Sequence, residues 1–157
     1  MRHAKSSWRT NDPDVRRPLS ARGTRDGVVA GQYLAEFPLD VVLCSRATRA
    51  KQTWQCAQLG GASCADVRFE PDLYEARPSD VLSLVAGLPD AAATALVIGH
   101  EPTLGDVIVR LAAGSPLTEQ VATKFPTAAI GVLTLPGGWD TLEPGSCTLT
   151  ALEIRRG

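Results

Sequence analysis

Two histidines, His3 and His100, are the side chains of this sequence best suited to nucleophilic or acid–base chemistry. A neutral imidazole carries a lone pair and titrates near neutral pH, so it can act as a nucleophile or as a proton carrier. His100 stands two residues after an apolar run at residues 95–98 that is typical of a buried strand. Ligands of open α/β sheets bind beyond the carboxyl ends of the strands, so His100 stands where such a sheet would hold a ligand.

Basic side chains gather in two places, although the whole chain has a formal net charge of −1. The first 25 residues hold Arg2, Lys5, Arg9, Arg16, Arg17, Arg22 and Arg25. Arg46, Arg49 and Lys51 follow the apolar run at residues 40–44. The balanced total charge provides no strong field for nucleic acid or an anionic membrane, so we expect neither as a partner. The local clusters are compatible with an anionic ligand.

Short apolar runs predict the strands that would position these residues. The runs at residues 40–44 and 95–98 are of the type found in parallel strands that are covered on both faces. We predict a weaker strand at residues 67–70 and a hairpin formed by residues 130–135 and 147–154. The polar groups after the first two runs, residues 45–49 and 99–103, should therefore meet at one edge of the sheet.

Helical spacing of apolar residues separates the predicted strands. Ser20 is suited to cap a helix over residues 20–37. Further helices are predicted over residues 47–59, 78–87 and 102–114. In the last of these, the i, i+3, i+4 and i+7 positions of one face are Leu104, Val107, Ile108 and Leu111. Strands that alternate with helices predict a three-layer α/β/α sandwich around a mostly parallel sheet.

The composition is that of an ordinary folded domain, with 44% apolar and 21% charged residues among 157. We expect a single domain over residues 1–157. No apolar run approaches the roughly 20 residues that span a bilayer, and no apolar signal segment opens the sequence, which favours a cytoplasmic protein. The four cysteines lack the C-x-x-C spacing of metal or redox sites, so we expect reduced, mostly buried thiols.

Three segments carry the residues with useful chemistry: residues 2–6 (RHAKS), 45–53 (SRATRAKQT) and 97–104 (VIGHEPTL). In this order they resemble the histidine phosphatase superfamily, and more narrowly the branch of the phosphohistidine phosphatase SixA. Residues 17–23 (RPLSARG) and 72–75 (DLYE) extend the resemblance over nearly the whole chain. Each segment alone is a weak signal, whereas the ordered set is strong.

The resemblance implies a phosphatase that works through a phosphorylated histidine. His3 would be the nucleophile, and Arg2 and Arg49 would hold the phosphoryl oxygens. His100 would donate to a phosphoryl oxygen and stabilise charge in the transition state. Guanidinium suits its role because it is always charged and its planar fork binds two oxygens. Phosphoryl transfer depends mainly on positioning and positive charge, so we expect no metal and no other cofactor.

The resemblance leaves open which residue protonates the leaving group. Many superfamily enzymes use a carboxylate after the middle strand, and Glu75 lies in that region, although a solvated loop glutamate fits the sequence equally well. Glu101 is a weaker candidate for the acid and a candidate for substrate contact. Ser45 and Arg17 are further candidates for substrate contact. A serine near a turn is more often a local cap, and Arg17 could equally be a surface side chain.

The resemblance favours a protein-borne phosphohistidine as the substrate, because the chain is too short for the large inserted cap with which bigger superfamily members enclose small substrates. A small phosphate ester, such as a sugar phosphate or a nucleotide, is the alternative substrate. A phosphate-binding regulatory module with impaired catalysis is the alternative from another functional class.

Superfamily members carry a short apolar strand directly before the Arg-His pair, whereas this sequence reaches the pair at residue 2. We therefore expect the first strand to be missing from the beginning of the sequence, and the native protein to carry several more apolar, β-prone residues upstream. Without them the sheet would lose buried area and hydrogen bonds. His3 would then be poorly fixed.

Overall fold

Three parallel strands form one sheet, in the order β2-β1-β3. They are β1 (Val41–Ser45), β2 (Asp66–Glu70) and β3 (Ala95–Ile98). The computed structural model describes residues 1–9 and 11–157. All residues of β1 are buried, as expected for a central parallel strand whose two faces are covered. These three predicted strands are confirmed, with shifts of one residue in β1 and β2.

Residues 1–3 extend the sheet along the free edge of β3. Arg2 pairs with Gly99 in parallel register, and the His3 amide donates to the Gly99 carbonyl at 3.0 Å. On the other side, the Arg2 amide donates to the Ala129 carbonyl at 3.0 Å, and the Ala128 amide donates to the His3 carbonyl at 3.2 Å. The backbone of His3 is held from both sides, in contrast to the expectation that it would be poorly fixed.

β4 (Ile130–Thr134) and β5 (Thr148–Glu153) form the antiparallel hairpin that the sequence predicts. β4 begins next to Ala129, the residue whose carbonyl accepts the Arg2 amide. Residues 1–3 therefore connect the parallel strands to the hairpin.

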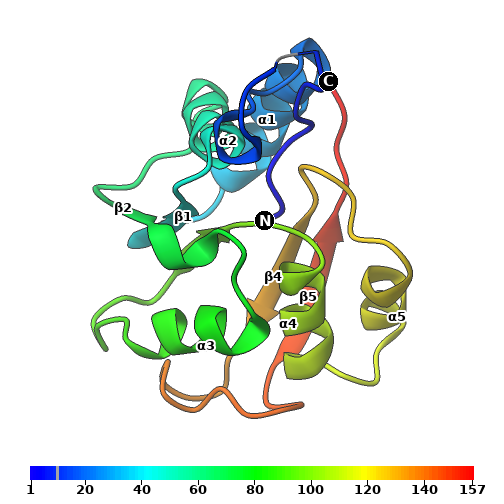
Figure 1. Ribbon diagram of the computed structural model, residues 1–157. Coiled ribbons are helices and arrows are strands. Elements are labelled where there is room, and N and C mark those ends of the chain that lie inside the picture. Colours follow the sequence, from blue (N-terminus) through cyan, green and yellow to red (C-terminus); the bar gives the residue numbers. More distant parts are fainter. Residues whose placement is uncertain (10) are drawn as a thin grey trace.

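α1 (Ala21–Leu34) and α2 (Thr48–Leu59) pack together on one face of the sheet (Figure 1). The Ser20 hydroxyl accepts the Gly23 amide at 3.1 Å and caps α1, as predicted. α1 ends at Leu34, before the predicted end at residue 37. Trp54 of α2 is fully buried in the core between these helices and the sheet.

The second core contains side chains of α3 (Pro78–Ala86), α4 (Thr103–Leu111) and α5 (Pro116–Thr123). Side chains of β1 alternate between the two cores: Val41 and Leu43 lie in this one, whereas Val42 and Cys44 lie in the core of α1 and α2. Helices on both faces confirm the predicted three-layer architecture. Among the helices that the structure describes, none combines the length and the apolar character needed to cross a membrane.

All four cysteines are free thiols, and Cys64 is the one that is not fully buried. This confirms the expectation of mostly buried, reduced thiols. Burial raises the pKa of Cys44 to about 12, so this thiol stays protonated and unreactive at neutral pH.

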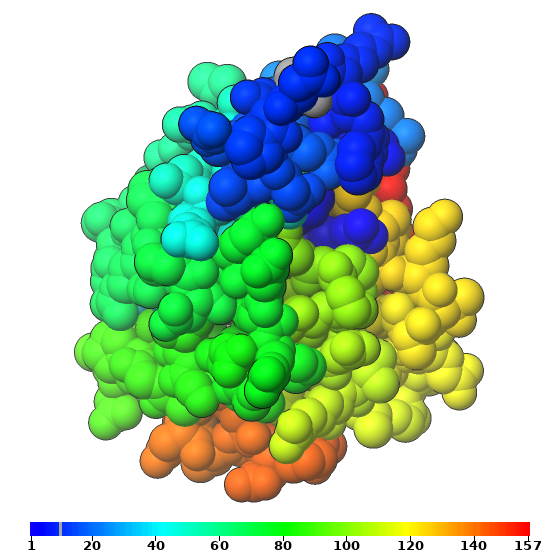
Figure 2. Space-filling view, viewed as in Figure 1, coloured from blue at the N-terminus to red at the C-terminus, as the bar shows by residue number. Residues whose placement is uncertain are grey.

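Two short 3-10 turns lie on one face of the molecule, η1 (Asp14–Arg16) and η2 (Pro71–Leu73). Figure 2 shows this face, where the blue amino-terminal segment lies next to the green segment that contains η2. The hydroxyl of Tyr74, directly after η2, donates to the Asp14 carboxylate at 2.9 Å. Segments far apart in the sequence therefore meet here.

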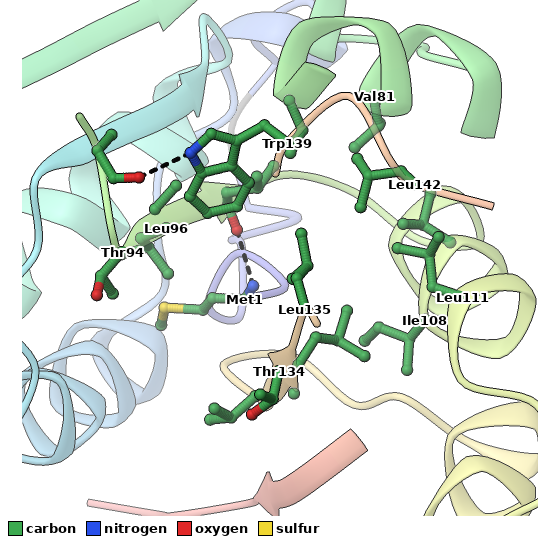
Figure 3. Close-up of a pocket in the computed structure, with 18 of the residues that line it drawn as sticks. Met1, Val81, Thr94, Leu96, Ile108, Leu111, Thr134, Leu135, Trp139 and Leu142 are labelled. Carbon is green, nitrogen blue, oxygen red and sulfur yellow. Dashed lines mark hydrogen bonds between the residues drawn. The ribbon is translucent and has the colours of Figure 1, made fainter. Parts of the chain in front are cut away.

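An apolar cavity of about 620 Å³ lies between β3 and β4, next to Met1 (Figure 3). Leu96, Leu135 and Trp139 are among the residues that line it. The Met1 ammonium donates to the Val97 carbonyl at 2.7 Å, and burial lowers the pKa of this ammonium to about 5. The cavity therefore lies beside Met1, between β3 and β4.

Candidate active site

The residues that follow β1 and β3 lie beside residues 1–3 at one edge of the sheet. The ring centroids of His3 and His100 are 5.0 Å apart. Arg49, in the first turn of α2, contacts both rings. The structure thus brings together three residues that the sequence predicts to form one site.

His3 is buried, and one of its ring nitrogens faces Arg49. Nδ1 lies 2.7 Å from the Ala4 carbonyl oxygen, so Nδ1 carries the ring proton and donates it. Nε2 accepts from Nε of Arg49 at 3.3 Å. Burial lowers the pKa of His3 to about 3, and the charges of Arg49 and Arg2 act in the same direction. His3 is therefore a neutral imidazole with its lone pair on Nε2.

The His100 ring is held between Ser45 and Arg49. Nε2 lies 2.7 Å from Oγ of Ser45, and Nδ1 lies 3.4 Å from Nη2 of Arg49. Because a guanidinium can only donate, Nδ1 is the acceptor and Nε2 carries the proton. Burial, followed by the charge of Arg49, lowers the pKa of His100 to about 4. Tyr74 packs edge to face against the ring, with the centroids 5.6 Å apart.

Arg49 is positioned by the start of α2 and by the amino-terminal segment. α2 begins at Thr48, directly after the turn that follows β1. The Thr53 hydroxyl donates to the Arg49 carbonyl at 2.6 Å and accepts the Ala4 amide at 2.9 Å. The first turn of α2 is therefore tied to the backbone next to His3, which fixes the two side chains relative to each other.

Asp14 joins the two buried arginines of the site. Its carboxylate accepts Nη2 of Arg49 at 3.0 Å and Nη1 of Arg17 at 2.8 Å. Its backbone carbonyl accepts Nη1 of Arg49 at 2.7 Å. Partial burial raises the pKa of Asp14, but the hydrogen bonds from Tyr74, Arg17 and Arg49 outweigh this effect and hold the pKa below its ordinary value. Asp14 is therefore ionised at neutral pH.

Arg17 and Arg2 add to the positive charge around the histidines. Arg17 is buried, and its Nη2 donates to Oγ of Ser6 at 2.8 Å. Arg2 is half-buried, and its Nη1 donates to the Phe125 carbonyl at 2.8 Å. The charge of Arg2 lowers the pKa of both histidines. Guanidinium groups around a neutral imidazole are suited to bind an oxyanion whose central atom the imidazole attacks.

Comparisons with known proteins agree with this chemistry. Residues 1–81 match the family model described as histidine phosphatase superfamily (branch 1). An uncharacterized protein of Mycobacterium tuberculosis is 39% identical over 162 residues, which cover 99% of this chain and 100% of that protein. The chain belongs to the histidine phosphatase superfamily.

Solved structures place this histidine phosphatase in the SixA-like branch. A candidate SixA phosphohistidine phosphatase from Nakamurella multipartitia is 30% identical with a TM-score of 0.86, covering 98% of this chain and 92% of that chain. The protein histidine phosphatase SixA in complex with tungstate has the same fold, with a TM-score of 0.79 and 24% identity over 97% of this chain and 92% of that chain. Membership in this branch supports phosphatase activity.

Glu75 directly follows Tyr74, the residue that packs against the ring of His100. Its backbone has a left-handed φ of 59°. The residue lines a neighbouring hollow together with Arg46, Asp72 and Asp80. Tyr74, the preceding residue, contacts both this hollow and the ring of His100.

Glu101 and Ser45 each contact other groups of the protein. The Glu101 carboxylate lies against Gly105 of α4, and burial raises its pKa to about 7. Ser45 is fully buried, and its hydroxyl is engaged by Nε2 of His100. Within residues 1–9 and 11–157, no group of three or more His, Cys, Asp and Glu side chains is arranged to hold a metal ion.

Two residues of the site, Asp14 and Tyr74, are not among those that the sequence predicts. Tyr74 belongs to a segment that carries the family resemblance, but its contact with His100 depends on the tertiary fold. Asp14 stands three residues before Arg17 in an exposed, proline-containing stretch. An acidic residue at this spacing from an arginine is the one local signal for the ion pair between them.

Proposed function

We propose that this histidine phosphatase transfers a phosphoryl group from its substrate to Nε2 of His3 and then to water. The observation that carries the proposal is the hydrogen bond from Nδ1 of His3 to the Ala4 carbonyl at 2.7 Å. This bond leaves the lone pair on Nε2, the nitrogen that faces Arg49. With the pKa of His3 lowered to about 3, the ring is neutral and nucleophilic at neutral pH.

In the first step, the Nε2 lone pair attacks phosphorus. The bond between phosphorus and the leaving group breaks as the new P–N bond forms. The leaving group departs with the electron pair of the broken bond and takes up a proton. Arg49, Arg17 and Arg2 stabilise the negative charge on the phosphoryl oxygens, which carries most of the catalysis because the transition state is loose.

His100 supports the bound phosphoryl group through Nδ1, because its Nε2–H is engaged by Ser45. Nδ1 needs a proton to donate, and a pKa of about 4 in the empty pocket leaves it without one. A phosphoryl dianion raises this pKa, because a neighbouring opposite charge favours the imidazolium. His100 therefore becomes a donor when the substrate is bound.

In the second step, water attacks the phosphorus of phosphorylated His3. The P–Nε2 bond breaks, inorganic phosphate forms, and the electron pair returns to Nε2. The proton of the attacking water passes to phosphate or to solvent. The bond from Nδ1 to the Ala4 carbonyl stays in place in both steps, so the ring is restored in its nucleophilic tautomer.

Phosphohistidine on a protein is the substrate that we propose. An alkoxide leaving group needs a proton donor, whereas the imidazole of phosphohistidine departs more readily. Asp14 is a poor donor because its pKa lies below the ordinary value, and Glu75 lines the neighbouring hollow. The Asp14 side chain is about half-exposed, so this side of the site is open to a side chain presented by another protein.

A panel of substrates tests the proposal: phosphohistidine protein, a sugar phosphate, a nucleotide and an aryl phosphate. We expect the phosphohistidine protein to be dephosphorylated fastest, and His3→Ala to lose about 10³-fold or more in rate. Lys5→Ala is the matched control, since Lys5 is exposed and lies in the same segment. Turnover of small esters alone would overturn the proposed substrate. Folded protein without turnover of any phosphorylated compound would instead support a binding module.

A further inference from the structure

The carboxylate of Asp14 accepts hydrogen bonds from Arg49 and Arg17, which the proposed function assigns to the phosphoryl group. Oδ2 accepts Nη2 of Arg49 at 3.0 Å and the Tyr74 hydroxyl at 2.9 Å. Oδ1 accepts Nη1 of Arg17 at 2.8 Å. Two guanidinium groups and a phenol therefore converge on one anion. The oxygens of a phosphoryl group would satisfy the same donors.

Every nitrogen of the two arginines is engaged while Asp14 is in place. In Arg49, Nε donates to His3, Nη1 to the Asp14 carbonyl, and Nη2 to the Asp14 carboxylate. In Arg17, Nη1 donates to Asp14, and the other two nitrogens donate to residues 6 and 7. The N–H groups that donate to the Asp14 carboxylate become available to a phosphoryl group only if this carboxylate withdraws.

Asp14 can withdraw more easily than its partners. Its side chain is 52% exposed, whereas those of Arg49 and Arg17 are 9% and 8% exposed. None of the residues of η1 is buried. Ion pairs of a half-exposed carboxylate are weak because water screens them. A ligand that competes for the arginines therefore moves the aspartate and leaves the guanidinium groups in position.

We infer that Asp14 is a resident counter-anion, which binds Arg17 and Arg49 in the empty pocket and is displaced by the phosphoryl group of the substrate. The inference rests on the proposed function, since it takes these arginines as phosphoryl-binding residues. A phosphoryl dianion carries more charge than one carboxylate and competes for the same donors. After hydrolysis, the return of Asp14 to the arginines promotes the release of inorganic phosphate.

Competition by Asp14 weakens the apparent affinity for phosphate, because phosphate can use the donors that face Asp14 only in molecules whose carboxylate has withdrawn. Removing the charge should therefore tighten the binding of inorganic phosphate by about tenfold. A positioning role alone predicts the opposite change. In that case the loss of Asp14 would let the arginines move apart, and phosphate would bind more weakly.

Isothermal titration calorimetry with inorganic phosphate tests the inference. We expect Asp14→Asn and Asp14→Ala to bind phosphate about tenfold more tightly than the unmodified protein. Asp14→Glu keeps the charge and should bind within about twofold of the unmodified protein. Asp12→Asn, an exposed residue of the same segment, is the matched control and should not change the affinity. Equal or weaker binding by both neutral variants, or no binding by any protein, overturns the inference.

The result can be separated from the fate of the proposed function, because phosphate binding requires no turnover. If no substrate is hydrolysed and the neutral variants still bind phosphate more tightly, the proposed reaction is wrong, whereas the inferred role of Asp14 as a counter-anion stands. If substrate is hydrolysed and the neutral variants bind phosphate no better, the counter-anion alone fails. Circular dichroism of each variant shows whether it is folded. If one of the two neutral variants does not fold, the other still tests the inference.

Discussion

The tautomers of His3 and His100 each follow from one hydrogen bond. The Ala4 carbonyl keeps the proton of His3 on Nδ1. Arg49, which can only donate, makes Nδ1 of His100 the acceptor and so keeps the proton of His100 on Nε2. The two rings therefore present different nitrogens to Arg49, which lies between them. Both lone pairs face the place where we propose that a phosphoryl group binds.

We predict that neither histidine titrates between pH 8 and pH 5 in the folded protein. Burial lowers the pKa of His3 to about 3 and that of His100 to about 4. Because these values lie below the ordinary value of about 6.5, the free energy of unfolding should fall as the pH drops below 6.5. Two-dimensional ¹⁵N NMR can follow both rings, and the urea-unfolded chain is the control. A ring that titrates near 6.5 in the folded protein would contradict the assigned environment.

We predict that Glu75→Gln changes the hydrolysis of phosphohistidine protein by no more than about twofold. Glu75 lines the neighbouring hollow, and an imidazole leaving group does not require a carboxylic acid. The measurement is kcat/KM for the variant and the unmodified protein. Asp72→Asn, in the same hollow, is the matched control. A loss of about tenfold or more in Glu75→Gln alone would make Glu75 the general acid.

The contacts of Asp14 could not be predicted from the sequence. Its partners Arg49 and Tyr74 lie 35 and 60 residues further along the chain. Contacts at such separations depend on how the whole chain folds. In contrast, the sequence could predict the proximity of His3, Arg49 and His100. Each of them lies near a recognisable apolar run or belongs to an ordered motif.

Among the elements, those with a strong local pattern could be predicted and those without one could not. The apolar runs of β1 and β3 and the capping serine of α1 are local signals, and the structure confirms these elements. The prediction lacks α5, which has only two buried residues, Thr118 and Val121. It also extends the preceding helix to residue 114, whereas α4 ends at Leu111. A helix this short that buries so few residues leaves little local pattern in the sequence, and tertiary packing stabilises it.

We predict that Gly31→Ala lowers the free energy of unfolding by about 1–3 kcal/mol, the usual cost of overpacking. Gly31 of α1 lies against α2, and a Cβ at this position would overlap the Ala57 backbone. Gly87→Ala is the matched control, because a Cβ there meets its nearest atoms at 3.6 Å, an ordinary contact distance. Urea unfolding measures both variants. Equal stabilities would show that α1 and α2 can move apart at little cost.

At the scale of the whole molecule, residues 1–3 join the parallel strands to the β4–β5 hairpin, and the apolar cavity lies beside Met1. Because Arg2 pairs with Gly99 in parallel, a residue before Met1 would lie opposite Val97. Two more residues would reach the position opposite Ala95. The cavity thus lies where a longer strand would run.

We predict that adding three or four apolar, β-branched residues before Met1 stabilises the protein. The added strand would pair with the edges of β3 and β4, fill apolar space and replace a buried ammonium by a peptide group. Each kcal/mol gained should raise the Tm by roughly 2–4 °C. A Gly-Ser extension of equal length is the control. An unchanged Tm with the apolar extension would show that the cavity does not accept a strand.

We also propose that residues 1–157 form a single domain. The two cores share β1, whose alternate side chains enter one core or the other. Loss of either core would remove one cover of the same buried strand. Urea unfolding should therefore follow one transition by fluorescence and by circular dichroism.

Trapping the phosphorylated intermediate tests the role of His3 most directly. The protein is mixed with phosphohistidine protein, quenched within one turnover under alkaline conditions and digested for mass spectrometry. We predict that the peptide containing His3 gains the mass of one phosphoryl group, and that His3→Ala shows neither this peptide nor turnover. A phosphoryl group on another residue of the chain, or full turnover by His3→Ala, would contradict the assignment of His3 as the nucleophile.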